Sequence, residues 1–198
     1  DDVPSAEELQ TLFGQAGYDL ISKGTQKHFD IYFDDDKNSL RHAGIALRKR
    51  RTGGKVLATL KANANVSGGL HEREEVEELM LGSNWPDTIY KRLKTVTDPW
   101  SLTERLELAN IRTRYVVKRN GSELAILSFD VVTANYPGTF DTATFEEVEI
   151  EALGSAGEKE SRALADVLER LIKLTPNSVT KLERAGALLT LSQSFQSE

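Results

Sequence analysis

Hydrophobic and polar residues alternate with a period of two along most of the chain, which is the pattern of half-buried β-strands. The strands predicted from this alternation are residues 26–34, 45–52, 55–62, 70–79, 111–119, 122–132 and 145–153. Thr52-Gly53-Gly54 and Asn120-Gly121 are short turn signals between neighbouring strands. Consecutive hairpins of this kind predict a mainly antiparallel sheet.

Apolar residues at helical spacing occur near the two ends of the chain and in its middle. Leu9, Leu12 and Phe13 form an apolar stripe typical of a first helix, and residues 157–173 predict a longer amphipathic one. Residues 84–109 are expected to be helical in pieces, because prolines interrupt them. These helices flank the predicted sheet.

The chain shows no repeat, low-complexity linker or change in composition that would separate domains. We therefore expect residues 1–198 to form one domain. A short last helix is predicted to open near Pro176 and Ser178, and residues 191–198 are expected to be a loose tail. The predicted fold class is α+β and mainly antiparallel β, as a barrel or a strongly curved sheet with flanking helices.

Composition narrows the classes of function. The chain is 39% hydrophobic and 28% charged, as in an ordinary globular protein, and its formal net charge is -6. Nucleic acid is an unexpected partner for an acidic chain. There are no cysteines, which excludes disulfides and thiolate metal sites and fits a reducing, cytoplasmic location. No apolar stretch has the length of a membrane span, so no membrane partner is expected.

Each predicted strand presents one charged face, and the charges on these faces differ in sign between strands. Arg48 and Arg50 share one face, as do Arg112 and Arg114, whereas the strand FEEVEIEAL is acidic. The charged-face residues of interest are Arg48, Arg50, Lys61, Arg73, Glu75, Glu77, Arg112, Arg114, Asp130, Glu147, Glu149 and Glu151. The opposite faces are mostly apolar.

Two interpretations of these charged faces remain open at this point. The commoner one for any single strand is a solvated face, with the apolar side packed on helices. The other is a binding site, in which arginines hold the oxygens of a polyanion and carboxylates hold divalent cations. Segregation of the charges by strand, and the preference for Arg over Lys, favour a site for phosphoryl chemistry.

Eight segments, in order and at fitting spacing across residues 26–190, resemble the CYTH domain of the triphosphate tunnel metalloenzymes. They are YFDD (32–35) followed by Leu40, GIALRKR (44–50), ATLK (58–61), REEVE (73–77), RTRYVV (112–117), Asp130, EEVEIE (146–151) and TKLERA (180–185). The middle of the chain most resembles the bacterial inorganic triphosphatase branch.

The resemblance implies an eight-stranded antiparallel barrel, closed or nearly closed, whose tunnel binds a triphosphate with Mg²⁺ or Mn²⁺. Phosphate-binding residues would then be Arg48, Arg50, Lys61, Arg73, Arg112, Arg114, Lys181 and Arg184. Metal ligands would be Glu75, Asp130, Glu147, Glu149 and, nearer a strand end, Glu151. Glu147, Glu149 and Lys181 would be the catalytic residues.

The N-terminal strand that marks the family, Glu-x-Glu-x-Lys, is absent from the sequence. The sequence begins Asp1-Asp2-Val3-Pro4, without a methionine, so we expect that strand to be missing from the chain as given. Asp35 replaces a usual threonine, which we regard as a minor departure.

The expected function is metal-dependent hydrolysis of inorganic triphosphate or a related triphosphate. The alternatives are a class IV-type adenylyl cyclase and a polyphosphate-binding module without catalysis. A lipocalin-like barrel for a small ligand is disfavoured by the charged strand faces, because the pockets of such barrels are mostly apolar. The expected partner is a triphosphate-containing small molecule, with a homodimer as the candidate assembly.

Overall fold

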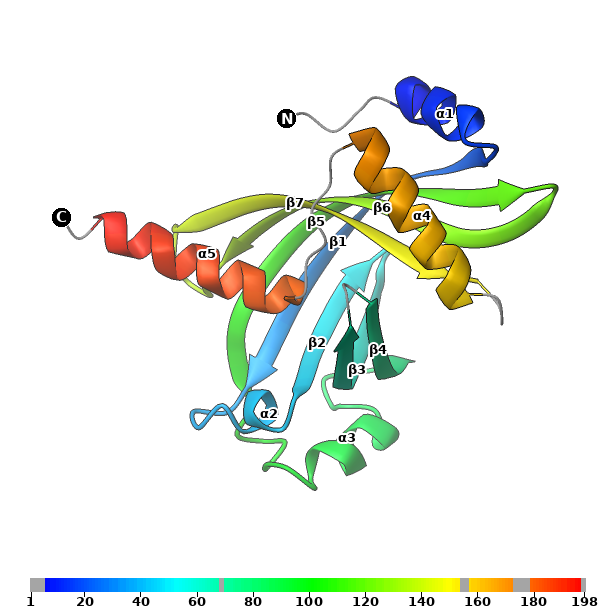
Figure 1. Cartoon of the computed structure of the whole chain (residues 1–198). Coiled ribbons are helices and arrows are strands. Elements are labelled where there is room, and N and C mark those ends of the chain that lie inside the picture. The colour runs from blue at the N-terminus through cyan, green and yellow to red at the C-terminus, as the bar shows by residue number, and fades with distance from the viewer. Residues whose placement is uncertain (1–5, 68–69, 154–156, 173–178, 197–198) are drawn as a thin grey trace. The chain divides into compact units, whose positions relative to one another are not determined.

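A computed structural model describes residues 6–67, 70–153, 157–172 and 179–196. Within them, seven strands form one sheet in the order β4-β3-β2-β1-β5-β6-β7 (Figure 1). The strands are β1 (Asp19–Asp34), β2 (Ile45–Thr52), β3 (Lys55–Ser67), β4 (Leu70–Leu79), β5 (Thr103–Arg119), β6 (Ser122–Asn135) and β7 (Thr142–Ala152). The helices are α1 (Ala6–Gln15), α2 (Ser39–His42), α3 (Asp87–Leu93), α4 (Gly157–Ile172) and α5 (Lys181–Gln196).

The predicted fold class is confirmed: the chain is α+β, with an antiparallel sheet and flanking helices. Seven strands are present in the described residues, against the eight that the family resemblance implies. Asn120 and Gly121 both have positive φ, at 51° and 80°, as a two-residue hairpin turn requires. The turn signal read from the sequence therefore joins β5 to β6 as expected.

Several boundaries differ from the sequence predictions. Residues 103–109 were predicted to be helical but open β5, because Leu106 and Leu108 alternate with exposed or half-buried polar residues and are themselves buried. The first strand begins at Asp19 rather than residue 26. Residues 191–196 are helical rather than a loose tail, since α5 continues to Gln196 beyond its buried anchor Leu189.

The chain divides into two compact units, which are taken in turn. Unit 1 comprises Asp1–Gln26, Ile111–Val131 and Glu146–Pro176. Unit 2 comprises Lys27–Asn110, Val132–Phe145 and Asn177–Glu198. Strands β1, β5, β6 and β7 each contribute a segment to both units.

In unit 1, α1 and α4 pack on the apolar face of the strand segments (Figure 1). Phe13 of α1 and Leu164 of α4 are fully buried in one cluster with alternate residues of β5 and β6. The strand residues in this cluster include Tyr115, Val117, Ala125, Leu127 and Phe129, with Val148 and Ile150 of β7 packed against them. Side chains alternate across a strand, so the charged residues of these segments occupy the opposite face.

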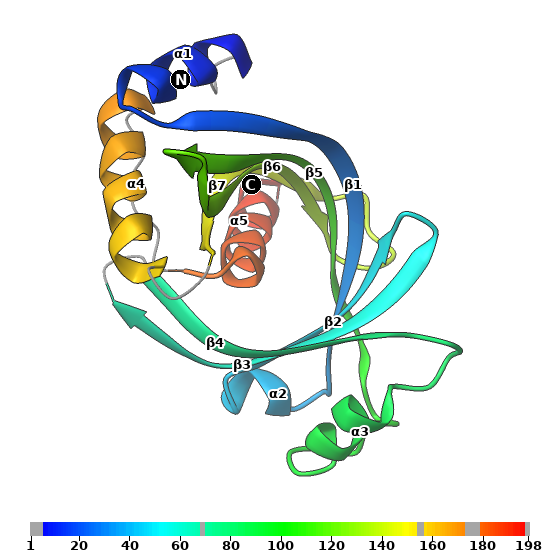
Figure 2. The same ribbon diagram turned by 90° about the vertical axis from the view of Figure 1, so that its right-hand side faces the viewer.

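In unit 2, α2 and α3 cover the apolar face of β2 and β3 (Figure 2). Leu40 of α2 and Leu93 of α3 are fully buried there with Leu47 and Leu60 of the strands. A second cluster joins Ala185 and Leu189 of α5 to Tyr32 and to residues of β5, β6 and β7. None of the helices in the described part of the chain has the length and apolar character needed to cross a membrane.

Candidate functional site

Unit 1 brings three of the predicted metal ligands together on its charged face. Asp130 of β6 and Glu147 and Glu149 of β7 each offer a carboxylate oxygen, and these oxygens lie within 4.8 Å of one another. Asp130 is buried, with 1% of its surface exposed, whereas Glu149 reaches solvent. This group, the carboxylate cluster, combines a buried anchor with an accessible rim.

Arg112 of β5 binds two members of the carboxylate cluster. Its Nε and Nη2 atoms donate hydrogen bonds to the two oxygens of Asp130, at 2.7 and 2.6 Å, and Nη2 also donates to Glu149. Burial lowers the pKa of Arg112, but its hydrogen bond to Asp130 and the charge of Glu149 outweigh burial and raise the pKa above its usual range. Arg112 is therefore a fixed positive charge at the cluster.

Arg114 lies two residues further along β5, on the same strand face as Arg112. Its Nε atom is buried and has no hydrogen-bond partner among the residues that the structure describes. A buried donor without a partner costs free energy unless a ligand or water satisfies it. Arg114 therefore has donor capacity available for an anion.

Unit 2 holds a second charged group around Asp30 of β1. The strand register places Asp30 opposite Arg50 and Tyr32 opposite Arg48. Arg50 donates two hydrogen bonds to Asp30, at 2.7 and 2.6 Å, and Arg48 donates one at 3.2 Å. Both arginines are buried, each 8% exposed, so the interpretation of this face as a plain solvated surface fails.

The electrostatics of Asp30 follow from these contacts. Burial raises the pKa of a carboxyl group, but the hydrogen bond from Arg50 and the charges of Arg48 and Arg50 outweigh burial here. The pKa of Asp30 is therefore held below its ordinary value of 3.8. Asp30 stays ionised and fixes both guanidinium groups.

The same face of unit 2 continues across β3 and β4. Lys61 pairs with Glu75 at 3.0 Å, and Arg48 approaches Glu75 at 4.0 Å. The hydroxyl of Thr59 donates a hydrogen bond to Glu77 at 3.0 Å. Glu75 and Glu77 thus each meet a donor from the residue opposite on β3, as the register of the two strands dictates.

Helix α5 carries the predicted residues Lys181 and Arg184. It packs on the charged face of unit 2, because Ala185 and Leu189 cluster with Tyr32, which shares its face with Arg48. The guanidinium of Arg184 lies over the ring of Phe145, 4.7 Å from its centroid. This cation–π contact orients Arg184 on that face.

Two predicted residues are not assigned to these groups. The side chain of Arg73 lies outside the described residues, although its backbone belongs to β4. Glu151 is exposed near the end of β7, as its position in the strand suggested. Their predicted roles stay predictions.

Sequence reasoning missed Asp30 and Asn110. Asp30 lies two residues before Tyr32 inside a predicted strand, but only the pairing of β1 with β2 places it opposite Arg50. Asn110 is 1% exposed, and its side-chain amide has no hydrogen-bond partner in the described part of the chain. It follows Leu106 and Leu108 on one face of β5, the face that meets α5.

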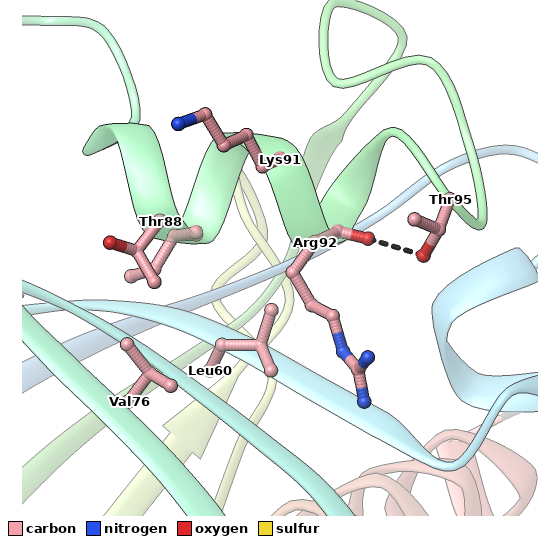
Figure 3. Close-up of a pocket in the computed structure, with 7 residues that line it drawn as sticks. Leu60, Val76, Thr88, Lys91, Arg92 and Thr95 are labelled. Atoms are coloured by element: carbon pink, nitrogen blue, oxygen red, sulfur yellow. Dashed lines mark hydrogen bonds between the residues drawn. The ribbon is translucent and has the colours of Figure 1, made fainter.

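A cavity of about 460 Å³ in unit 2 is separate from the charged face. It lies between α3 and the strands β3 and β4 (Figure 3). Leu60 and Val76, which line it, are direct partners in the strand register and flank Lys61 and Glu75 in sequence. Neighbouring residues in a strand point to opposite faces, so this cavity opens on the apolar side.

The carboxylate cluster suits a divalent cation in its donor chemistry. Its ligand atoms are all oxygens, which are the ligands that Mg²⁺ prefers and that Mn²⁺ accepts. Asp130 is buried and Glu149 is exposed, so solvent reaches part of the cluster. The residues present therefore fit such an ion.

Known proteins resemble this chain in sequence and in fold. The model of the CYTH domain family matches residues 3–185. Among curated proteins, none matches the chain at a significant level. The chain resembles HpAC1 from Hippeastrum, a candidate adenylyl cyclase with a dominant triphosphatase activity, at 20% identity and a TM-score of 0.64 over 93% of this chain and 92% of that one.

Two further solved structures share the fold. A candidate adenylate cyclase from Bacillus halodurans is 19% identical, with a TM-score of 0.58 over 92% of each chain. A protein from Pyrococcus horikoshii is also 19% identical, with a TM-score of 0.52 over 96% of this chain and 95% of that one. With the family match covering most of its length, the chain belongs to the CYTH domain family.

Proposed function

We propose that this protein is a divalent-metal-dependent hydrolase of inorganic triphosphate. The observation that carries the proposal is the carboxylate cluster of Asp130, Glu147 and Glu149 with Arg112 bound to it and Arg114 beside it on β5. Metal-assisted phosphoryl transfer needs these two kinds of group: oxygen ligands for the ion and guanidinium groups for the phosphate charge.

The residues have distinct proposed roles. Asp130, Glu147 and Glu149 would hold Mg²⁺ or Mn²⁺, with Glu75 and Glu151 as further candidates. When bound, the metal would neutralise phosphate charge and activate water. Arg48, Arg50, Lys61, Arg73, Arg112, Arg114, Lys181 and Arg184 are the proposed phosphate-binding residues.

The unit 2 contacts support preorganised anion binding. Asp30 holds Arg48 and Arg50 in place before any ligand arrives, so less side-chain entropy is lost when they bind phosphate oxygens. Arginine also presents paired donors that match phosphate geometry. Lys181, on α5, is the proposed cation for the transferred phosphate.

A class IV-type adenylyl cyclase is the second candidate. It is favoured by the descriptions of two similar structures as candidate adenylyl or adenylate cyclases. Such an enzyme would release cyclic AMP and pyrophosphate from ATP. The charge pattern supports binding of any triphosphate, so the product is what separates the two activities.

The test compares three substrates in the presence of Mg²⁺ or Mn²⁺. Tripolyphosphate, ATP and thiamine triphosphate are each incubated with the protein, and phosphate, pyrophosphate and cyclic AMP are measured. The proposal expects the highest kcat/KM for tripolyphosphate, with release of orthophosphate. Cyclic AMP from ATP as the main product would favour the cyclase instead, and calorimetric binding of tripolyphosphate without turnover would indicate a binding module.

A further inference from the structure

We propose that Arg112 is an exchangeable counter-ion of the carboxylate cluster: it occupies the carboxylates in the metal-free protein and must give up at least Glu149 when a divalent cation binds. This inference rests on the proposed metal site at Asp130, Glu147 and Glu149. As a counter-ion, Arg112 would act on the carboxylate cluster before any substrate binds. The same arginine then becomes available to phosphate only after the metal is in place.

The geometry of Arg112 carries the first step. Three carboxylate oxygens accept its hydrogen bonds: both oxygens of Asp130 and Oε2 of Glu149. These two residues also belong to the group whose ligand oxygens lie within 4.8 Å of one another. A metal that uses this group therefore takes oxygens that the guanidinium already holds.

Charge makes this sharing unfavourable. A divalent cation and a guanidinium attached to the same carboxylates repel each other, and screening is weak where Asp130 is buried. The side chain of Arg112 is itself only 17% exposed, so solvent does little to reduce the repulsion. Each cation must therefore weaken the binding of the other.

The two carboxylates differ in how easily they release Arg112. The side chain of Asp130 is fully buried and accepts two well-aligned bonds, whereas that of Glu149 is 46% exposed and accepts one. Water can replace a donor at Glu149 but not at Asp130. Glu149 is accordingly the contact that a metal would displace first. Arg112 would stay anchored at Asp130 through Nε and Nη2, and the Nη2 hydrogen that Glu149 now accepts would become available to another acceptor.

Unit 2 repeats this pairing independently. Lys61, a predicted phosphate-binding residue, forms an ion pair at 3.0 Å with Glu75, a predicted metal ligand. The side chains of both residues are partly exposed, so the pair can open at small cost. In both units, a basic side chain proposed to bind phosphate forms an ion pair with a carboxylate proposed to bind metal.

The experiment measures Mn²⁺ binding alone, without any phosphate compound. Wild type, Arg112→Gln and Arg114→Gln are titrated with Mn²⁺, and free Mn²⁺ is followed by electron paramagnetic resonance. Arg114→Gln is the matched control, because it removes the same charge from the same face of β5 and Arg114 has no hydrogen bond to the cluster among those the structure describes. Circular dichroism checks the fold of each variant.

We expect Arg112→Gln to bind Mn²⁺ at least about fivefold more tightly than wild type, the lower end of usual coupling between two sites. Arg114→Gln should change the affinity by clearly less. If Arg112→Gln binds Mn²⁺ equally or more weakly, or if Arg114→Gln tightens binding as much, the exchange role of Arg112 is wrong while the metal site stands. If wild type and Arg112→Gln both fail to bind Mn²⁺, the proposed metal site itself is wrong.

A second variant covers the case in which Arg112→Gln does not fold. Arg112→Lys keeps the positive charge, but a lysine cannot bridge Asp130 and Glu149 with a planar fork of donors. It should bind Mn²⁺ more tightly than wild type, because the carboxylates are held less firmly. Affinity equal to or below that of wild type would contradict the proposal.

Discussion

The carboxylate of Asp30 on β1 is clamped by the guanidinium of Arg50 on β2 through two parallel hydrogen bonds, at 2.7 and 2.6 Å. The Asp30 side chain is 1% exposed and that of Arg50 is 10% exposed. Such a buried, two-pronged pair fixes the arginine in one orientation. Asp30 is thus a positioning residue for Arg50 and, through its third contact, for Arg48.

Replacing Asp30 by Asn should weaken substrate binding more than it slows chemistry. The Asp30→Asn side chain has lost the charge that holds Arg48 and Arg50, so both arginines would lose their preorganisation. We expect KM for tripolyphosphate to rise with a smaller change in kcat, measured by steady-state kinetics. A fall in kcat at unchanged KM would contradict the positioning role.

The same substitution should also destabilise the fold. Removing one charge of a buried pair leaves the other uncompensated, which costs about 3 kcal/mol or more in the free energy of unfolding. Urea denaturation measures this difference. Asp36→Asn is the control: Asp36 pairs with Arg105, but its side chain is 91% exposed, so its loss should cost less than about 1 kcal/mol.

The stabilisation by Asp30 should disappear in acid. Its pKa in the folded chain lies below the ordinary value of 3.8, so the unfolded chain binds the proton more readily. The contribution is fully present above pH 3.8 and is lost as the pH falls towards the folded pKa. The gap in unfolding free energy between wild type and Asp30→Asn should be smaller at about pH 3 than at about pH 7; a constant gap would contradict the assignment.

Glu149→Gln should impair metal-dependent activity while leaving the fold intact. An amide is a poorer ligand for a divalent cation than a carboxylate, and the Glu149 side chain is 46% exposed. At limiting metal, we expect turnover of tripolyphosphate to fall about tenfold or more, because even groups that only orient metal ligands have effects of that size. Glu146→Gln, on the opposite face of β7, is the control and should retain activity. Full activity of Glu149→Gln at limiting metal would exclude Glu149 as a ligand.

Arg50→Ala should weaken tripolyphosphate binding by about 1.5–3 kcal/mol, the usual contribution of a hydrogen bond to a charged group. Isothermal calorimetry at low metal concentration measures this change. Arg51→Ala is the control, because Arg51 is exposed and lies on the opposite strand face, over the ring of Phe29. Equal losses in the two variants would indicate a general charge effect rather than a specific contact.

The sequence alone determined which strands have one apolar and one charged face, and where most of the helices lie. Period-two alternation is a local property, so residues 45–52 were predicted as a strand with the bounds that β2 has. The turn at Asn120-Gly121 was equally local, since positive φ at both residues favours Asn and Gly. Local preference failed at residues 103–109, where Leu and Glu favour a helix but burial of Leu106 and Leu108 in a sheet prevails.

Only the tertiary structure decided which charges meet. Alternation places Arg48, Arg50 and Arg112 on strand faces, but the partner of each depends on the register between strands that are distant in sequence. Asp30 looked like any polar residue of a strand until pairing of β1 with β2 set it opposite Arg50. The acidic strand β7 likewise finds a positive partner in Arg112, which donates a hydrogen bond to Glu149 although it lies 37 positions earlier in the chain. Pairing of successive strands brings these distant segments within hydrogen-bond distance.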